Sequence, residues 1–239
     1  MDPTALPERV LTVTAHPDDV DFGAGGTVGG WTAEGVPVSY CVVTDGDAGG
    51  FDPGIPRADI PGIRRREQRA AGRELGVTDI HFLGYHDGEL TVTHGLRRDI
   101  ARVIRKVRPS LVLIQSPVRN LERMYASHPD HLAAGEAAMQ AVYPDARNPF
   151  AHPTLLTDEA LEPWSVPEVW LTGFERPDHW VDITGDFPLK LAALRAHRSQ
   201  TGHLDDLEER IRSWGERTAA EAGLAPGRIA EAFKVLDTR

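Results

Sequence analysis

Residues 10–19 read VLTVTAHPDD, a run of β-branched and apolar residues that stops at a histidine, a proline and two aspartates. The first six of these residues have the composition of a strand that is buried on both faces of a sheet. Pro17 cannot continue a strand ladder, so the chain turns between His16 and Asp19 and leaves polar side chains at the end of the strand. In open α/β sheets, this end of a strand is where ligands bind.

A strand followed by a helix recurs through the first 140 residues. Strands are predicted over 10–15, 36–44, 80–83, 111–114, 169–171, 180–183 and 233–235, and helices over about 27–34, 64–75, 96–107, 131–142, 189–200 and 204–222. This alternation predicts an α/β fold, a Rossmann-like doubly wound and mostly parallel sheet with helices on both faces. The length of 239 residues predicts one domain over 1–239.

Polar residues follow each of the first four predicted strands. They are His16, Asp45, Asp87 and His128. Because the carboxyl ends of parallel strands meet at one edge of a sheet, these side chains are expected to gather there. That edge is the candidate active site.

A second tetrad, His-Pro-Asp-His at 128–131, follows the fourth strand and resembles the tetrad after the first. Zinc favours nitrogen and carboxylate ligands, and a catalytic zinc site uses three protein ligands and a water. The only cysteine, Cys41, lies in a predicted buried strand, so sites of several thiolates are excluded. We predict one zinc ion per chain, held by His16, Asp19 and His131.

The remaining residues of the two tetrads have predicted catalytic roles. Asp18 lies beside the ligand Asp19 without being needed as a ligand, and a free carboxylate there can act as general base. His128 can protonate the leaving amine or stabilise the oxyanion. Asp130 can orient His128 or a ligand histidine from behind.

The two tetrads, with Gly25-Gly26-Thr27 after the first, resemble the LmbE-like zinc deacetylase family. This family is also called PIG-L, after N-acetylglucosaminyl-phosphatidylinositol de-N-acetylase. The resemblance spans nearly the whole chain. It implies zinc-dependent removal of an acyl group, acetyl in the first instance, from an N-acetylglucosamine-type sugar or its conjugate. It also implies the same three ligands, with Asp18 as base and His128 as acid.

Further residues match the family pattern less specifically. The resemblance implies that Arg64 and Asp87 lie around the sugar. Tyr125 is one residue from the position where some members place a tyrosine that polarises the carbonyl. His197 and Gln200 also match, and we predict structural roles for them, since polar residues late in a helix often satisfy backbone groups.

Other functions were weighed against deacetylation. One is an amidase that acts on a related non-acetyl amide of a sugar-thiol or natural-product conjugate. A dinucleotide-binding oxidoreductase is suggested by the glycines of 23–29, but the last glycine is one residue late and the tetrad separates them from the strand. A non-catalytic sugar-binding module would be expected to lack Asp18 or the histidines.

Composition limits the partners and the compartment. The net charge of −10 disfavours nucleic acid and anionic membranes. No stretch approaches the roughly 20 apolar residues that span a bilayer, and the N-terminus lacks the pattern of a signal peptide. A single cysteine fits a reducing compartment, so we expect a cytoplasmic protein acting on a small-molecule amino-sugar conjugate. A homo-oligomer is compatible with the sequence.

Three irregular segments are predicted to govern substrate choice: loops 45–62 and 115–127, and a Pro-rich excursion at 144–167. Loop 45–62 is rich in Gly, Asp and Pro, and loops of this length in compact domains are usually functional. We predict that it is mobile without substrate and helps to cover the site.

Overall fold

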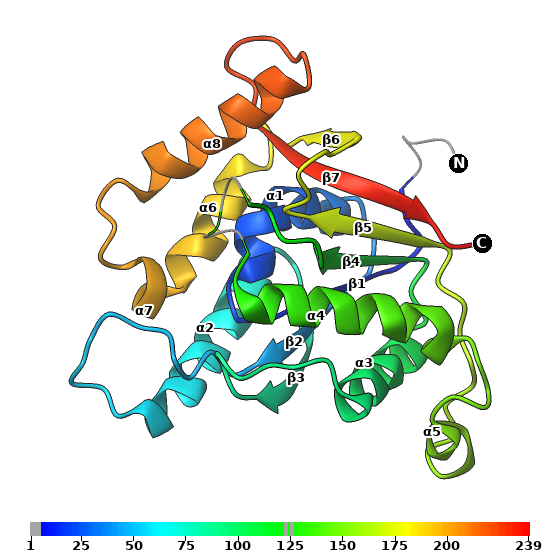
Figure 1. The fold of residues 1–239 in the computed structure, drawn as a ribbon. Coiled ribbons are helices and arrows are strands. Elements are labelled where there is room, and N and C mark those ends of the chain that lie inside the picture. Colours follow the sequence, from blue (N-terminus) through cyan, green and yellow to red (C-terminus); the bar gives the residue numbers. More distant parts are fainter. Residues whose placement is uncertain (1–5, 122–123, 125–126) are drawn as a thin grey trace.

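A seven-stranded sheet forms the centre of the molecule, with strand order β3-β2-β1-β4-β5-β7-β6 (Figure 1). The computed structural model describes residues 6–121, 124 and 127–239. Strands β1 to β5 pair in parallel, whereas β7 runs antiparallel to β5 and β6. The strands are β1 (Val10–Thr14), β2 (Val38–Thr44), β3 (Asp79–Tyr85), β4 (Leu111–Gln115), β5 (Glu168–Thr172), β6 (His179–Asp182) and β7 (Ala230–Asp237).

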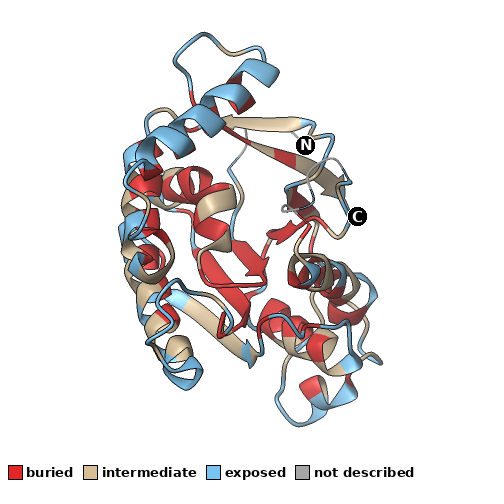
Figure 2. Ribbon diagram, turned by 60° about the vertical axis from the view of Figure 1, so that its left-hand side comes forward, coloured by how far each residue is buried: buried red, intermediate tan, exposed pale blue. Residues whose placement is uncertain are grey.

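Helices cover both faces of this sheet. The bounds are α1 (Asp19–Ala33), α2 (Ile60–Glu74), α3 (His94–Val107), α4 (Pro129–Gln140), α5 (Pro153–Thr157), α6 (Phe187–Ala196), α7 (Arg198–Thr201) and α8 (Leu207–Glu221), with a 3₁₀ turn at Arg57–Asp59 and a π-helical turn at Ala141–Ala146. Helices α3 and α4 pack in one core cluster, α1 and α2 contribute to a second, and α6 and α8 form a third. In Figure 2 the central strands of the sheet are buried, whereas its edge strands are only partly buried and the outer faces of the helices are exposed. The predicted doubly wound, mostly parallel α/β fold is confirmed.

The side chains of β1 pack on both faces of the sheet, which explains why its sequence is apolar at successive positions. Leu11 and Val13 pack with α3 and α4, whereas Val10 packs on the opposite side with the residues around α1 and α2. All five residues of β1 are buried. Cys41 in β2 is also fully buried, as expected, and burial raises the pKa of its thiol above the usual range. A strand in the middle of a two-faced sheet needs apolar side chains in both directions.

Helix α1 begins earlier than predicted. It starts at Asp19, directly after the first tetrad, and its backbone leaves helical geometry at Ala24. The backbone N–H groups that this kink frees, on Gly26 and Thr27, donate to the buried carboxylate of Glu231 at 3.0 and 2.8 Å. The predicted start near residue 27 was therefore wrong and corresponds to the second part of a kinked helix. Glycine composition alone does not reveal a cap that comes from the far end of the chain.

Other helix boundaries also differ from the predictions. Helix α2 starts at Ile60, which shortens the preceding loop to 45–56 and one 3₁₀ turn. Helix α4 starts at Pro129, so His131 lies inside its first turn. The helix predicted over 189–200 is interrupted at His197, where α6 ends and α7 begins. In the part of the chain that the structure describes, none of the helices has the length and apolarity to cross a membrane.

Candidate active site and metal centre

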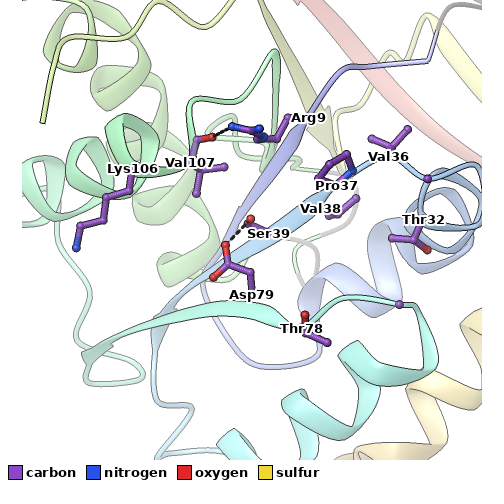
Figure 3. Close-up of a pocket in the computed structure, with 12 residues that line it drawn as sticks. Arg9, Thr32, Val36, Pro37, Val38, Ser39, Thr78, Asp79, Lys106 and Val107 are labelled. Atoms are coloured by element: carbon purple, nitrogen blue, oxygen red, sulfur yellow. Dashed lines mark hydrogen bonds between the residues drawn. The ribbon is translucent and has the colours of Figure 1, made fainter.

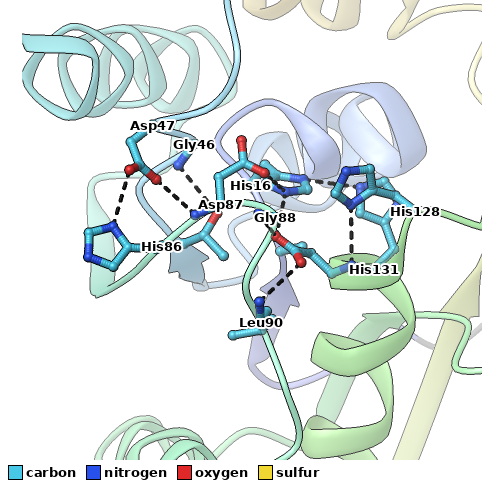
Figure 4. A network of polar contacts seen from close by, with 12 residues as sticks. His16, Gly46, Asp47, His86, Asp87, Gly88, Leu90, His128 and His131 are labelled. Atoms are coloured by element: carbon cyan, nitrogen blue, oxygen red, sulfur yellow. Dashed lines mark hydrogen bonds and ion pairs between the residues drawn. The ribbon is translucent and has the colours of Figure 1, made fainter. Parts of the chain in front are cut away.

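Three connections between elements bring Asp87 and the polar residues of the two tetrads together at the carboxyl edge of the sheet. His16 and Asp19 follow β1, Asp87 follows β3, and His128 and His131 lie at the start of α4, which follows β4. Figure 4 shows the side chains converging on one point. The edge that was predicted from strand ends is therefore a real cluster of side chains.

Donor atoms of three side chains form a triangle at the centre of this cluster, and Asp19 takes part with both carboxylate oxygens. His16 Nδ1 lies 3.2 Å from His131 Nε2 and 3.4 Å from Asp19 Oδ2. His131 Nε2 lies 3.1 Å from Asp19 Oδ1. A tetrahedral zinc ion, with ligand bonds of about 2.0–2.2 Å, places its ligand atoms about 3.3–3.5 Å apart. The spacing and the chemistry of the three side chains therefore fit zinc.

The second ring nitrogen of His16 is held from behind. His16 Nε2 lies 3.0 Å from Asp87 Oδ1 and 3.2 Å from Asp130 Oδ2. Asp130 is fully buried and also accepts hydrogen bonds from the backbone N–H groups of Gly88 and Leu90, at 2.7 and 3.2 Å. This arrangement fixes the ring so that Nδ1 faces the donor triangle, as carboxylates behind metal-binding histidines commonly do.

The charges around His16 attract a cation. Burial of the ring acts to lower its pKa, but Asp19, Asp130 and Asp87 together raise the pKa to about 12. Such a site holds a proton tightly when nothing else neutralises the carboxylates. A divalent metal ion at the donor triangle would neutralise them instead.

Asp18 lies beside the triangle in an unusual backbone conformation. Its φ of 93° and ψ of −25° are left-handed, which is rare for a residue with a side chain. Arg64 Nη2 lies 3.0 Å from Asp18 Oδ2 and also donates to the Pro17 carbonyl, and the backbone N–H of Asp18 donates to Gln68 Oε1 at 2.8 Å. Burial raises the pKa of Asp18 to about 6, with Arg64 acting against it. At neutral pH the carboxylate form still dominates.

His128 is the N-cap of α4. Its Nδ1 accepts a hydrogen bond from the backbone N–H of Asp130 at 3.2 Å. A neutral ring that accepts at Nδ1 carries its proton on Nε2. Burial, and then the neighbouring His16 and His131, lower the pKa of His128 below its usual value. The ring can therefore be a neutral donor at the edge of the site.

Asp87 and Arg64, which the resemblance implies lie around the sugar, each contact a residue of the first tetrad. Asp87 contacts His16, as described above. Arg64 is 3% exposed, and its guanidinium contacts Asp18 and backbone carbonyls. Tyr125 lies outside the described residues. Asp45, at the end of β2, pairs with Arg65 at 2.6 Å and is not part of the donor cluster.

The sequence-based interpretation missed two buried polar residues near Asp18. Gln68 and Asp21 are each fully buried, and Gln68 Nε2 lies 2.9 Å from Asp21 Oδ2. One signal was available: Gln68 follows Arg64 by four residues, which places both on the same face of a helix. Asp21 had no such signal, because it lies in a segment that was predicted to be irregular.

The glycines of α1 are packed against side chains. A Cβ at Gly26 would lie 2.6 Å from Ile183 Cδ1, and one at Gly29 would lie 3.1 Å from Leu189 Cδ1. These glycines therefore permit close packing, against α6 and the segment after β6. The pyrophosphate of a dinucleotide needs open backbone at such glycines, so this packing argues against the oxidoreductase alternative.

A cavity of about 640 Å³ extends from Asp19 and His131 toward α8 and β7. Its apolar lining includes Phe22 and Trp214. A buried ion pair, Lys190 Nζ to Glu231 Oε1 at 2.5 Å, forms part of the lining. The volume is in the usual range for a small-molecule site.

A second hollow, of about 460 Å³, lies at the opposite edge of the sheet, where β1 and β2 begin (Figure 3). Its polar groups bond to their neighbours: Arg9 Nη1 donates to the Val107 carbonyl at 2.8 Å, and Ser39 Oγ donates to Asp79 Oδ2 at 2.6 Å. None of the tetrad residues lines it. It is therefore not the candidate active site.

Comparisons with known proteins identify the family. The model of the family described as GlcNAc-PI de-N-acetylase, PIG-L, matches residues 11–142. A diacetylchitobiose deacetylase of Thermococcus kodakarensis is 35% identical over 193 residues, which cover 81% of this chain and 70% of that protein. A probable N-acetyl-alpha-D-glucosaminyl L-malate deacetylase 2 of Bacillus cereus is 33% identical, covering 87% of this chain and 91% of that protein. The solved structure of an N,N'-diacetylchitobiose deacetylase from Pyrococcus horikoshii is similar with a TM-score of 0.89 and 33% identity, covering 99% of this chain and 86% of that chain. The chain therefore belongs to the PIG-L family of de-N-acetylases.

Proposed function

We propose that this protein is a zinc-dependent N-deacetylase that hydrolyses the acetamide of an N-acetylglucosamine-type sugar conjugate. The observation that carries the proposal is the triangle of donor atoms from His16, Asp19 and His131, with Asp18 next to Asp19 in the chain and the ring of His128 4.9 Å from that of His16. One zinc ion per chain fits this triangle. The relatives named above are, by their names, deacetylases of amino-sugar conjugates.

Asp18 is proposed as the general base. A bound zinc ion would lower the pKa of a water molecule to about 7 and polarise the amide carbonyl. Asp18 then takes a proton from the water as it attacks the carbonyl carbon. Its pKa of about 6 leaves it ionised at neutral pH, and a nearby cation would lower that pKa further.

His128 is proposed as the general acid. An amide nitrogen leaves poorly as an anion, so a proton must reach it before the carbon–nitrogen bond breaks. Because Nδ1 of His128 accepts from the backbone, Nε2 is the atom that can donate this proton. The lowered pKa leaves the ring mostly neutral at neutral pH, so it must take up a proton before it acts as acid, and the proton that Asp18 removes from water can supply it. Asp130 positions both His16 and His128.

The cavity beside Asp19 and His131 supports a conjugate as substrate. An acetyl group alone occupies little of about 640 Å³. We propose that the cavity receives the group attached to the amino sugar, and that Arg64 and Asp87 act on the sugar through Asp18 and His16, which they contact. The sugar contact of Tyr125 stays a prediction. A related non-acetyl amide remains an alternative substrate of the same site.

A panel of acetylated amino sugars tests the proposed function. The zinc-loaded protein is incubated with N-acetylglucosamine, diacetylchitobiose and the malate and inositol conjugates of N-acetylglucosamine, and released amine and acetate are measured. We expect equal amounts of both products with at least one conjugate, and none after removal of zinc with a chelator. Stoichiometric zinc without amine from any substrate would favour a sugar-binding module instead.

We propose three further properties of the whole chain. It forms one domain over 1–239. It works in a reducing compartment such as the cytoplasm, because its only cysteine is buried and unpaired. A homo-oligomer is compatible with this fold. We propose that loop 45–62, of which 45–56 is irregular in the structure, is mobile without substrate and helps to cover the site; its exposed Phe51 packs on His203 with ring centroids 3.8 Å apart. Limited proteolysis with and without substrate tests the loop, since equal cutting rates would argue against a cover.

A further inference from the structure

A chain of buried hydrogen bonds leads from Asp18 to the C-terminal third of the protein. The backbone N–H of Asp18 donates to Gln68 Oε1 at 2.8 Å. Gln68 Nε2 lies 2.9 Å from Asp21 Oδ2, and His197 Nε2 lies 2.8 Å from the same oxygen. The side chains of Gln68, Asp21 and His197 are all fully buried. Because these side chains are not exposed to water, each must find its hydrogen-bond partner within the protein. The network is therefore rigid only if every one of its hydrogen bonds is kept.

The chemistry of the groups fixes the direction of every bond in this chain. A backbone N–H can only donate, so Gln68 must present its amide oxygen to Asp18. The amide nitrogen of Gln68 therefore faces Asp21, which accepts as a carboxylate. His197 in turn must donate from Nε2. Only one arrangement of the four groups satisfies all of these bonds.

The break between α6 and α7 places His197 in this chain. Its φ of −82° and ψ of 60° are not helical, and its backbone carbonyl accepts from Thr201 Oγ1 at 3.0 Å. A continuous helix over 189–200 would carry the side chain elsewhere. His197 lies beyond residues 11–142, which are the part that the family model matches.

We infer that Gln68, Asp21 and His197 are positioning residues that hold Asp18 in its left-handed conformation with its carboxylate beside the metal site. This inference rests on the proposed function, in which Asp18 is the base. The conformation is unfavourable for a residue with a side chain, so it persists only where the surroundings impose it. Arg64 holds the carboxylate, and Gln68 holds the backbone N–H.

His197→Leu removes the donor at the far end of this chain and His197→Gln retains one. We expect His197→Leu to bind zinc stoichiometrically, to keep its KM within about twofold and to lose about 10–100-fold in kcat, since a misplacement near 1 Å can cost about 10² in rate. His197→Gln should recover most of the kcat. If His197→Leu does not fold, Gln68→Leu makes the same test from α2.

A matched control is available in another buried histidine–aspartate pair. His152 Nε2 lies 3.1 Å from Asp145 Oδ2, both side chains are almost fully buried, and the pair lies beyond the C-terminal end of α4, whereas the second tetrad is at its start. His152→Leu should lower the thermal midpoint and leave kcat per folded molecule unchanged. Equal losses of kcat in His152→Leu and His197→Leu would overturn the inference, because general destabilisation would then explain both.

A double-mutant cycle separates positioning from a merely structural role. If His197 acts through Asp18, His197→Leu should have little further effect on the residual rate of Asp18→Asn. Multiplicative losses in the double variant, or wild-type kcat in His197→Leu, would overturn the inference while leaving the deacetylase proposal intact. Wild-type kcat in Asp18→Asn would instead overturn the proposed mechanism itself.

Discussion

Two clusters of buried charged side chains lie toward opposite ends of α4, and their charges are balanced in different ways. In the cluster after the C-terminal end, Asp145 accepts two hydrogen bonds from Arg97, at 2.8 and 2.6 Å, and faces His152 Nε2 at 3.1 Å. The Arg97 guanidinium and His152 help to hold the pKa of Asp145 below its usual value, although burial alone would raise it. This carboxylate is already neutralised by the protein.

The cluster at the N-terminal end of α4 is not balanced in this way. Around His16, the carboxylates of Asp19, Asp87 and Asp130 all lie within 3.4 Å of a ring nitrogen. One imidazolium cannot neutralise three carboxylates. The comparison teaches that a closed ion pair stabilises the fold, whereas an excess of buried negative charge around convergent donors marks a cation site.

Loss of a ligand should have the largest effect. His131→Ala removes one corner of the donor triangle, and we expect metal content to fall to a small fraction of one ion per chain and activity to become undetectable. The metal-free thermal midpoint should stay close to that of metal-free wild type, because the His131 side chain is about a quarter exposed. Elemental analysis after gel filtration checks the result. Full zinc content in this variant would show that the ligand assignment is wrong.

Removal of the base should have the next largest effect. Asp18→Asn keeps the shape of the side chain but not its basicity, so turnover should fall by about 10²–10⁴-fold, the usual contribution of general acid–base catalysis. Zinc content should stay near one ion per chain. Steady-state rates together with elemental analysis check this. Loss of zinc along with the rate would mean that Asp18 is a ligand.

The balanced cluster should respond in stability and not in chemistry. Asp145→Ala leaves Arg97 without its partner, and we expect a loss of roughly 2–4 kcal/mol in the free energy of unfolding, since Arg97 can reach solvent in part. Because folding lowers the pKa of Asp145, its stabilisation is present above the unfolded value near 4 and is lost as pH falls below it. Urea unfolding at pH 7 and pH 3.5 checks both points. An equal gap between variant and wild type at the two pH values would contradict this account.

Zinc affinity should depend on pH across the neutral range. The pKa of His16 without metal is about 12, so zinc must displace a proton from it at any pH near neutral. The apparent affinity should therefore fall about tenfold for each unit of decrease in pH, since metal ligands must be deprotonated to bind. A histidine with an ordinary pKa would give a flat response above about pH 7. Competition with a chelator at pH 7, 8 and 9 distinguishes the two, and a flat response would show that the carboxylates do not act on His16 as described.

The sequence predicts the part of the site that is formed by runs of consecutive residues. The two tetrads follow buried strands, and strand ends of a parallel sheet share one edge, so the proximity of His16 and His131 could be predicted. Asp21 and His197 could not. They are 176 positions apart, and their bond depends on a kinked α1 and on the break between α6 and α7.

Helix boundaries show the same limit. The start of α1 was missed because Glu231, near the end of the chain, caps Gly26 and Thr27 in the middle of the helix. Local propensity cannot include a partner that is more than 200 residues away. The apolar strands were predicted well because burial on both faces of a sheet needs only local composition.

The smallest effect is expected in the cavity between the metal site and α8. Trp214 is 37% exposed and lines this cavity, so its ring can pack against the group attached to the sugar. Trp214→Ala should raise the KM for a conjugate by about 3–10-fold, since an aromatic contact contributes about 0.5–1.5 kcal/mol. The kcat and the zinc content should not change, because the ring does not contact the donor triangle. N-acetylglucosamine lacks the attached group that is proposed to contact Trp214, so its KM should be unaffected. Trp214→Phe keeps an aromatic face and should retain most of the preference for the conjugate. An equal rise in KM for both substrates would mean that the substitution disturbs the metal site, and unchanged KM for both would mean that the conjugate leaves the site by another path.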